Sequence, residues 1–145
     1  MPDDLEPDRP GDSAGRSGHI CVVDDDPDIR QCLRFLLEDE GYAVEEADNG
    51  EAALGLLQSD PRPRVLLLDR MMPRLDGIQT LRRLEGGPAE VRQRTVILFM
   101  TARHDPPEPE SMGLIHRSTF ATVIKPFDLD WVLATVARAS EHLAG

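Results

Sequence analysis

The chain has 145 residues, which is enough for one ordinary domain and too few for two. Its formal net charge of −11 disfavours direct binding to nucleic acid or to an anionic membrane surface, and the longest basic run is Arg82-Arg83. No apolar stretch is long enough to span a membrane, and the N-terminus does not resemble a signal peptide, so we expect a cytoplasmic protein.

Residues 1–18 have no hydrophobic periodicity and are rich in proline, glycine and acidic residues. This composition predicts a disordered acidic tail. Hydrophobic patterning begins near His19, so residues 19–145 are predicted to form one folded domain.

The folded part opens with a predicted strand over 19–24, a short apolar run that ends in acids. The next apolar residues recur at helical spacing, and Gly41 ends that predicted helix. These residues are Ile29, Cys32, Leu33, Leu36 and Leu37. Cys21 and Cys32 both fall on apolar stripes and lack a metal-ligand partner at suitable spacing, so we interpret both as small core residues.

Two further strand and helix pairs follow. Residues 42–47 form a predicted strand, and Asn49 is expected to cap a helix that continues to Gln58. The run 65–69 is apolar up to Asp69, as in a parallel strand covered on both faces. Ile78, Leu81 and Leu84 then mark a third helix.

The last third of the chain is less regular. Residues 95–100 and 120–124 read as strands, whereas the segment 103–118 is ambiguous. Three prolines at 106, 107 and 109 predict that any helix there is short, irregular or late to begin. Asp128 is expected to cap a final helix. Its core stripe is predicted as Leu129, Val132, Leu133, Val136, Ser140 and Leu143, and its outer face as Trp131, Thr135, Arg138 and His142.

Strands and helices therefore alternate five times along the chain. Such alternation with short links predicts an α/β fold, a doubly wound, flavodoxin-like arrangement in which a βα unit is repeated five times around a five-stranded parallel sheet. In sheets of this kind, functional residues gather at the carboxyl ends of the strands.

Chemically active side chains follow four of the predicted strands. Asp24, Asp25 and Asp26 end the first strand, and Asp69, Thr101 and Lys125 end the third, fourth and fifth. Two carboxylates 4 Å apart repel by about 4 kcal/mol at an effective dielectric constant of 20. A divalent cation relieves this repulsion, and ligands that are all oxygen favour Mg²⁺ over zinc. A hydroxyl and an amine beside such a cluster indicate a phosphoryl-transfer site built on one nucleophilic carboxylate.

Four segments carry a resemblance to a known family: 22–27 (VVDDDP), 68–77 (LDRMMPRLDG), 100–102 (MTA) and 124–127 (IKPF). Together they resemble the signature blocks of response-regulator receiver domains in two-component phosphorelay systems, over about residues 19–143. The resemblance implies that Asp69 is the phosphoacceptor and that Mg²⁺ is the cofactor. It also implies roles for the neighbours: Asp24, Asp25, Asp69 and the backbone carbonyl of Met71 as metal ligands, and Thr101 and Lys125 as contacts of the phosphoryl oxygens.

The resemblance further implies a phosphohistidine donor, on a histidine kinase or a histidine phosphotransfer protein, and a protein that catalyses only its own phosphorylation and dephosphorylation. We expect output through contacts with another protein, with Trp131 and Arg138 on the outer face of the last helix as candidate anchors. A phosphorylation-dependent homodimer is a further candidate.

Two features depart from the family pattern. Thr122 stands where such domains usually carry Tyr or Phe, and Phe120 shares its strand parity. The second feature is the proline-rich segment 103–118. These departures leave open a receiver-fold scaffold that acts without phosphorylation. A phosphohydrolase of the haloacid-dehalogenase type also fits the spacing of Asp24 and Asp26, but it leaves the Asp69 block unexplained. A flavodoxin-like cofactor binder is disfavoured by three acids where a phosphate loop would lie.

Overall fold

The computed structural model describes residues 18–144, so all but the last residue of the predicted tail (1–18) lies outside the described residues. In this described part, a parallel sheet of five strands has the order β3-β2-β4-β5-β6. The strands are β2 His19–Val23, β3 Ala43–Ala47, β4 Arg64–Asp69, β5 Thr95–Ala102 and β6 Ala121–Lys125. This is the predicted five-stranded, doubly wound α/β fold.

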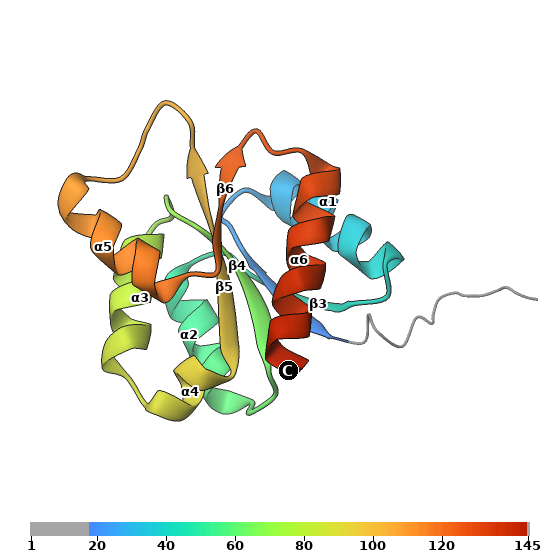
Figure 1. Cartoon of the computed structure of the whole chain (residues 1–145), viewed down its shortest axis with the longest axis horizontal. Helices are drawn as coiled ribbons and strands as arrows, with labels where there is room; N and C mark the ends of the chain where they lie inside the picture. Colours follow the sequence, from blue (N-terminus) through green and yellow to red (C-terminus); the bar gives the residue numbers. More distant parts are fainter. Residues whose placement is uncertain (1–17, 145) are drawn as a thin grey trace, which may run out of the picture.

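Helices cover both faces of the sheet (Figure 1). They are α1 Pro27–Asp39, α2 Gly50–Ser59, α3 Gly77–Gly86, α4 Ala89–Gln93, α5 Pro109–Ser118 and α6 Leu129–Ala144. One core lies between the sheet and helices α1 and α6, and the other lies between the sheet and helices α2 to α5. Among the described residues, no helix combines the length and the apolar character that crossing a membrane requires.

Local sequence signals account for most helix boundaries. The Asn49 side chain accepts a hydrogen bond from the Ala52 amide and so caps α2, as predicted. Gly41, just beyond α1, has a φ of 101°, which glycine adopts without steric cost. The irregular segment contains α5, which starts late, with Pro109 in its first turn, where a missing amide hydrogen costs nothing.

Three sequence-based expectations were wrong. Cys21 is buried, and burial raises the pKa of its thiol to about 12, but Cys32 is exposed because it lies at the margin of the apolar stripe of α1. On α6, Leu129 is 40% exposed in the first turn, whereas Thr135 is fully buried. The Thr135 hydroxyl donates to the Trp131 carbonyl, and this bond satisfies its polar group inside the core.

The short helix α4 was not predicted. It has no side-chain hydrogen bond at its N-cap, Pro88, and it buries only Val91, so its five residues carry no periodic signal. By contrast, α6 keeps most of its predicted core stripe, with Val132 and Val136 buried. The errors therefore fall on single helix turns and leave the topology unchanged.

The turn after β4 brings backbone segments into close approach at Gly77. A Cβ atom there would lie 2.5 Å from the Asp69 carbonyl oxygen and 2.8 Å from the Arg70 Cα. The Gly77 amide donates to the Arg70 carbonyl, at 2.8 Å. The first residue of α3 is thus packed directly against the end of β4, which fixes the backbone at Asp69.

We predict that Gly77→Ala lowers the free energy of unfolding by about 1–3 kcal/mol, because the methyl group displaces backbone rather than a flexible side chain. Gly55→Ala is the matched control: it also lies in a helix, has open space around the added methyl, and should be neutral or stabilising by about 1 kcal/mol. Urea denaturation of both variants measures the difference. Equal effects at the two positions would contradict the close approach at Gly77.

Candidate functional site

The predicted site residues converge at the carboxyl ends of β2, β4, β5 and β6. Parallel register places Val23 beside Leu68, Asp69 beside Met100, and Thr101 beside Ile124. The strands therefore end level with one another, and the residues that follow them meet at one edge of the sheet.

Lys125 holds the centre of this cluster. Its ammonium nitrogen lies 2.7 Å from Asp24 Oδ2 and 3.0 Å from Asp69 Oδ1. Burial alone would lower the pKa of Lys125, but its hydrogen bonds to Asp24 and Asp69 outweigh burial and raise it. One ammonium therefore joins the first strand to the central strand and stays charged between the two carboxylates.

The Asp24 carboxylate is oriented from two sides. It is 1% exposed, and its Oδ1 accepts the Asp26 amide at 2.9 Å while its Oδ2 accepts Lys125. The Asp26 side chain points elsewhere, since it accepts the Asp28 amide and caps α1. Of the three consecutive acids, Asp26 thus has a structural role, and Asp24 and Asp25 face the site.

Asp69 ends the central strand and is 6% exposed. The pKa of its carboxyl is raised from 3.8 to about 6. Burial is the main cause, the hydrogen bond to Lys125 opposes it, and the neighbouring Asp24 and Asp25 add to the increase. The carboxylate is therefore ionised at neutral pH but electrostatically unfavourable. A bound cation would therefore stabilise it.

The residues present fit a magnesium ion. One carboxylate oxygen from each of Asp24, Asp25 and Asp69 lies within 4.8 Å of the others. Opposite ligands of an octahedral Mg²⁺ are separated by about 4 Å, so small side-chain movements suffice to bring these oxygens into range. Asp25 is exposed, which leaves that side of the cluster open to solvent.

Thr101 supplies a hydroxyl without a partner. Its Oγ1 is buried, and no described residue hydrogen-bonds to it. Buried polar groups are normally paired, so an unpaired hydroxyl beside the carboxylate cluster marks a position where an additional acceptor fits. Met71 follows Asp69 by two residues, and its side chain is exposed.

Sequence reasoning missed Arg70, the neighbour of Asp69. Its side chain is only 10% exposed and forms ion pairs with Asp105 and Glu108 of the segment between β5 and α5. The available signal was an arginine directly after an apolar strand, together with acids in a segment that no pattern explained.

Comparisons with known proteins agree with this geometry. A sequence model of the family described as "Response regulator receiver domain" matches residues 20–137. Response regulator MprA of Mycobacterium tuberculosis is 41% identical over 118 residues, which are 81% of this chain and 48% of that protein. MprA of Mycolicibacterium vanbaalenii is 40% identical over 115 residues, 79% of this chain and 47% of that protein. The chain thus spans about half the length of these relatives.

Solved structures show the same fold. A CheY-like response regulator receiver domain protein from Methanospirillum hungatei superposes with a TM-score of 0.77 at 29% identity, covering 88% of this chain and 97% of that one. Chemotaxis response regulator CheY4 of Vibrio cholerae superposes with a TM-score of 0.71 at 26% identity, covering 85% and 98%.

We predict that Asp69→Asn is more stable than the wild type at about pH 7.5 in EDTA, by roughly 1–3 kcal/mol. The raised pKa means that the folded protein binds this proton more tightly than the unfolded chain, so ionisation costs stability as pH rises from about 4 to about 6. Asparagine removes that cost. Below about pH 4 the two proteins should converge. Urea denaturation at both pH values provides the measurement, and a difference independent of pH would contradict the buried, strained carboxylate.

Proposed function

Because the chain belongs to the response regulator receiver domain family, we propose that Asp69 accepts a phosphoryl group from the phosphohistidine of a partner protein. The observation that carries the proposal is the Asp69 carboxylate itself: it is buried, its pKa is raised to about 6, and Lys125 and two further carboxylates surround it. This is the arrangement that phosphoryl transfer needs, where catalysis consists of positioning and charge neutralisation.

In the proposed reaction, an Asp69 oxygen attacks phosphorus. The new O–P bond forms as the N–P bond of the phosphohistidine breaks, and the imidazole nitrogen leaves with the bonding electron pair. Lys125 neutralises one phosphoryl oxygen, and the unpaired Thr101 hydroxyl donates to another. A bound Mg²⁺, held by Asp24, Asp25, Asp69 and the Met71 carbonyl, would supply further charge neutralisation. The protein on this proposal is a signalling protein that catalyses only its own phosphorylation and dephosphorylation.

We predict that incubation with acetyl phosphate and Mg²⁺ adds one phosphoryl mass to the wild type and none to Asp69→Asn. The asparagine amide keeps the shape of the side chain but lacks a nucleophilic oxygen anion. Intact mass spectrometry measures the adduct. An adduct that persists in the variant would show that another carboxylate accepts the phosphoryl group.

Two controls accompany this measurement. EDTA should abolish the adduct in the wild type. Asp25→Ala removes an exposed ligand without disturbing the core. It should raise the Mg²⁺ concentration required for phosphorylation by about tenfold or more, which is equivalent to about 1.4 kcal/mol of binding free energy. A wild type that takes no phosphoryl group under any of these conditions would favour the phosphorylation-independent scaffold.

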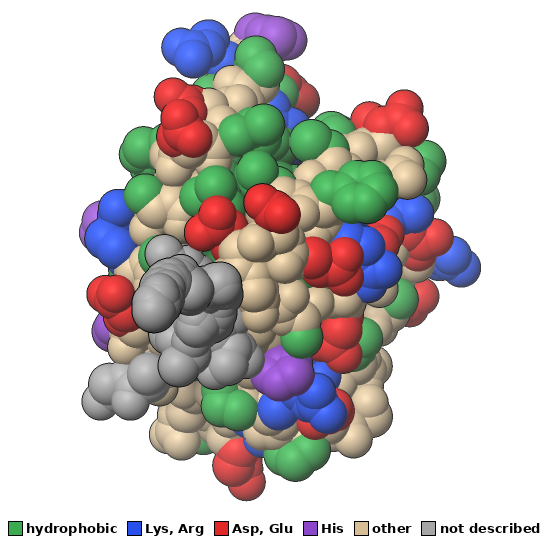
Figure 2. Space-filling model, turned by 90° about the vertical axis from the view of Figure 1, so that its right-hand side faces the viewer, with side chains coloured by type: hydrophobic (Ala, Val, Ile, Leu, Met, Phe, Trp, Pro, Cys, Tyr) green, Lys and Arg blue, Asp and Glu red, His purple; other side chains and the backbone are tan. Residues whose placement is uncertain are grey.

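The partners are a histidine kinase or histidine phosphotransfer protein as donor, and a further protein as the receiver of the signal. A cytoplasmic location remains a sequence-based prediction. For the output surface we propose the outer face of α6, where Trp131 is 42% exposed and Arg138 is also exposed. On the side of the molecule that carries α1 and α6, hydrophobic side chains gather toward the end where the strands finish (Figure 2). Aromatic and arginine side chains of this kind anchor protein interfaces.

We predict that Trp131→Ala weakens or abolishes either self-association of the phosphorylated protein or capture of a partner, and leaves phosphorylation unchanged. Sedimentation in both phosphorylation states and affinity capture provide the measurement. The matched control is Phe35→Ala on α1, an aromatic residue that is 66% exposed on a different helix. Unchanged association in Trp131→Ala, with an intact fold, would show that this face is only solvated surface.

A further inference from the structure

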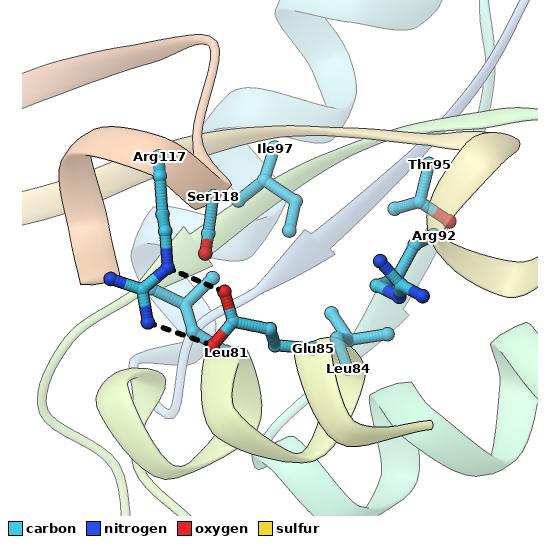
Figure 3. Close-up of a pocket in the computed structure, with 8 residues that line it drawn as sticks. All are labelled: Leu81, Leu84, Glu85, Arg92, Thr95, Ile97, Arg117 and Ser118. Carbon is cyan, nitrogen blue, oxygen red and sulfur yellow. Dashed lines mark hydrogen bonds and ion pairs between the residues drawn. The ribbon is translucent and has the colours of Figure 1, made fainter. Parts of the chain in front are cut away.

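Helix α5 packs on the core through Leu114 and Ile115, and an arginine forms ion pairs near each of its ends. At its C-terminal end, Arg117 forms a paired hydrogen-bonded ion pair with Glu85 of α3, at 2.7 and 3.0 Å. A cavity of about 200 Å³ lies beside this pair, and Leu81 of α3 and Ile97 of β5 are among the residues that line it (Figure 3). The seam between α5 and α3 is therefore incompletely filled at this end.

The other end of α5 is tied to the phosphoacceptor strand through Arg70. Its Nη1 donates to the Asp105 carbonyl at 2.6 Å, and the guanidinium also lies 3.4 Å from the Asp105 carboxylate and 3.7 Å from that of Glu108, the N-cap of α5. A second open cavity, of about 420 Å³, borders Arg70, Glu108 and the buried Ser111. The start of α5 therefore borders an open groove on the side of α3.

The backbone of Arg70 is fixed on both sides. Its amide donates to the Met100 carbonyl at 3.0 Å, and its carbonyl accepts the Gly77 amide at 2.8 Å. The two neighbouring side chains reach different parts of the molecule: Asp69, the last residue of β4, contacts Lys125, whereas Arg70 contacts the segment before α5. A single rigid dipeptide therefore carries both the phosphoacceptor and the tie to α5.

The usual route for the signal is altered in this chain. Thr122 replaces the customary aromatic residue and is exposed, and the ring of Phe120 lies 5.6 Å from that of His142, near the end of β6 opposite to Lys125. Neither side chain is positioned to report a change at Thr101. Another connection between Asp69 and α5 is therefore required if phosphorylation is to move this helix.

We propose that Arg70 is the positioning residue that makes this connection: it anchors the 103–108 segment to the phosphoacceptor strand, so that phosphorylation of Asp69 displaces α5. This inference rests on the proposed phosphorylation. The Thr101 hydroxyl turns to the new phosphoryl oxygens and draws the start of the segment toward Asp69. Because Arg70 holds the middle of the same segment at Asp105, the segment turns about this point, and the turn displaces Pro109, where α5 begins. Without Arg70, the 103–108 segment changes its conformation and α5 stays in place.

The test uses the full, isotope-labelled chain, with intact mass for phosphoryl content and amide chemical shifts for conformation. In the wild type, phosphorylation should shift amides around Lys125 and along α5. In Arg70→Gln, phosphoryl content and the shifts around Lys125 should be retained, while the α5 shifts are lost. Arg70→Lys, which keeps the charge but not the planar fork, should restore part of them. Arg117→Gln, the matched control at the distant end of α5, should keep them.

A second variant keeps the inference testable if Arg70→Gln does not fold. Asp105→Asn with Glu108→Gln removes the charges on the exposed side of the tie, at residues that are 58% and 63% exposed, and should reduce the α5 shifts in the same way. If α5 shifts fully in both the Arg70→Gln and the loop variants, or fails to shift in phosphorylated wild type, the inference is overturned while the proposed function stands. A wild type that takes no phosphoryl group overturns both.

Discussion

The site depends on one ammonium group placed between two buried carboxylates. Lys125 reaches from the edge strand of the sheet to Asp24 and Asp69, residues that end two other strands. Without a cation at this point, the carboxylates would repel one another at the position where the sheet requires them to lie close together. The same pairing leaves Asp69 with a raised pKa, because one ammonium compensates only part of the cost of burial and of the neighbouring acids. The fold thus holds a carboxylate whose charge a bound metal ion would compensate.

The sequence was sufficient to predict this arrangement because parallel strands of equal reach bring their carboxyl ends to one edge. Asp24, Asp69, Thr101 and Lys125 were each predicted to end a strand, and they meet as expected. The family match favours a receiver domain over the phosphohydrolase and the flavodoxin-like cofactor binder, which were compatible with parts of the sequence pattern. What periodicity could not supply was the exposure of individual helix residues: Cys32 and Thr135 lie at the margins of their apolar stripes, where the angle to the sheet decides burial.

The connection between Asp69 and α5 was beyond sequence reasoning for a different reason. Arg70 lies within the 68–77 block, but the resemblance implies no role for it. Its partners lie 35 and 38 positions further along the chain, in a segment whose prolines made the start of the helix ambiguous. Only tertiary structure shows that this arginine is nearly buried and that its charge is balanced by that segment.

The central claim is that Asp69, the carboxylate that ends the central strand, is the one that becomes phosphorylated. Peptide mapping after borohydride reduction tests this claim most directly. Borohydride converts an aspartyl phosphate to homoserine and leaves free carboxylates unchanged, so the modified residue is marked permanently. The account predicts homoserine at position 69 alone, in the peptide that contains Asp69 and Arg70. Homoserine at Asp24 or Asp25, or unmodified peptides after a confirmed mass shift of the intact protein, would contradict it.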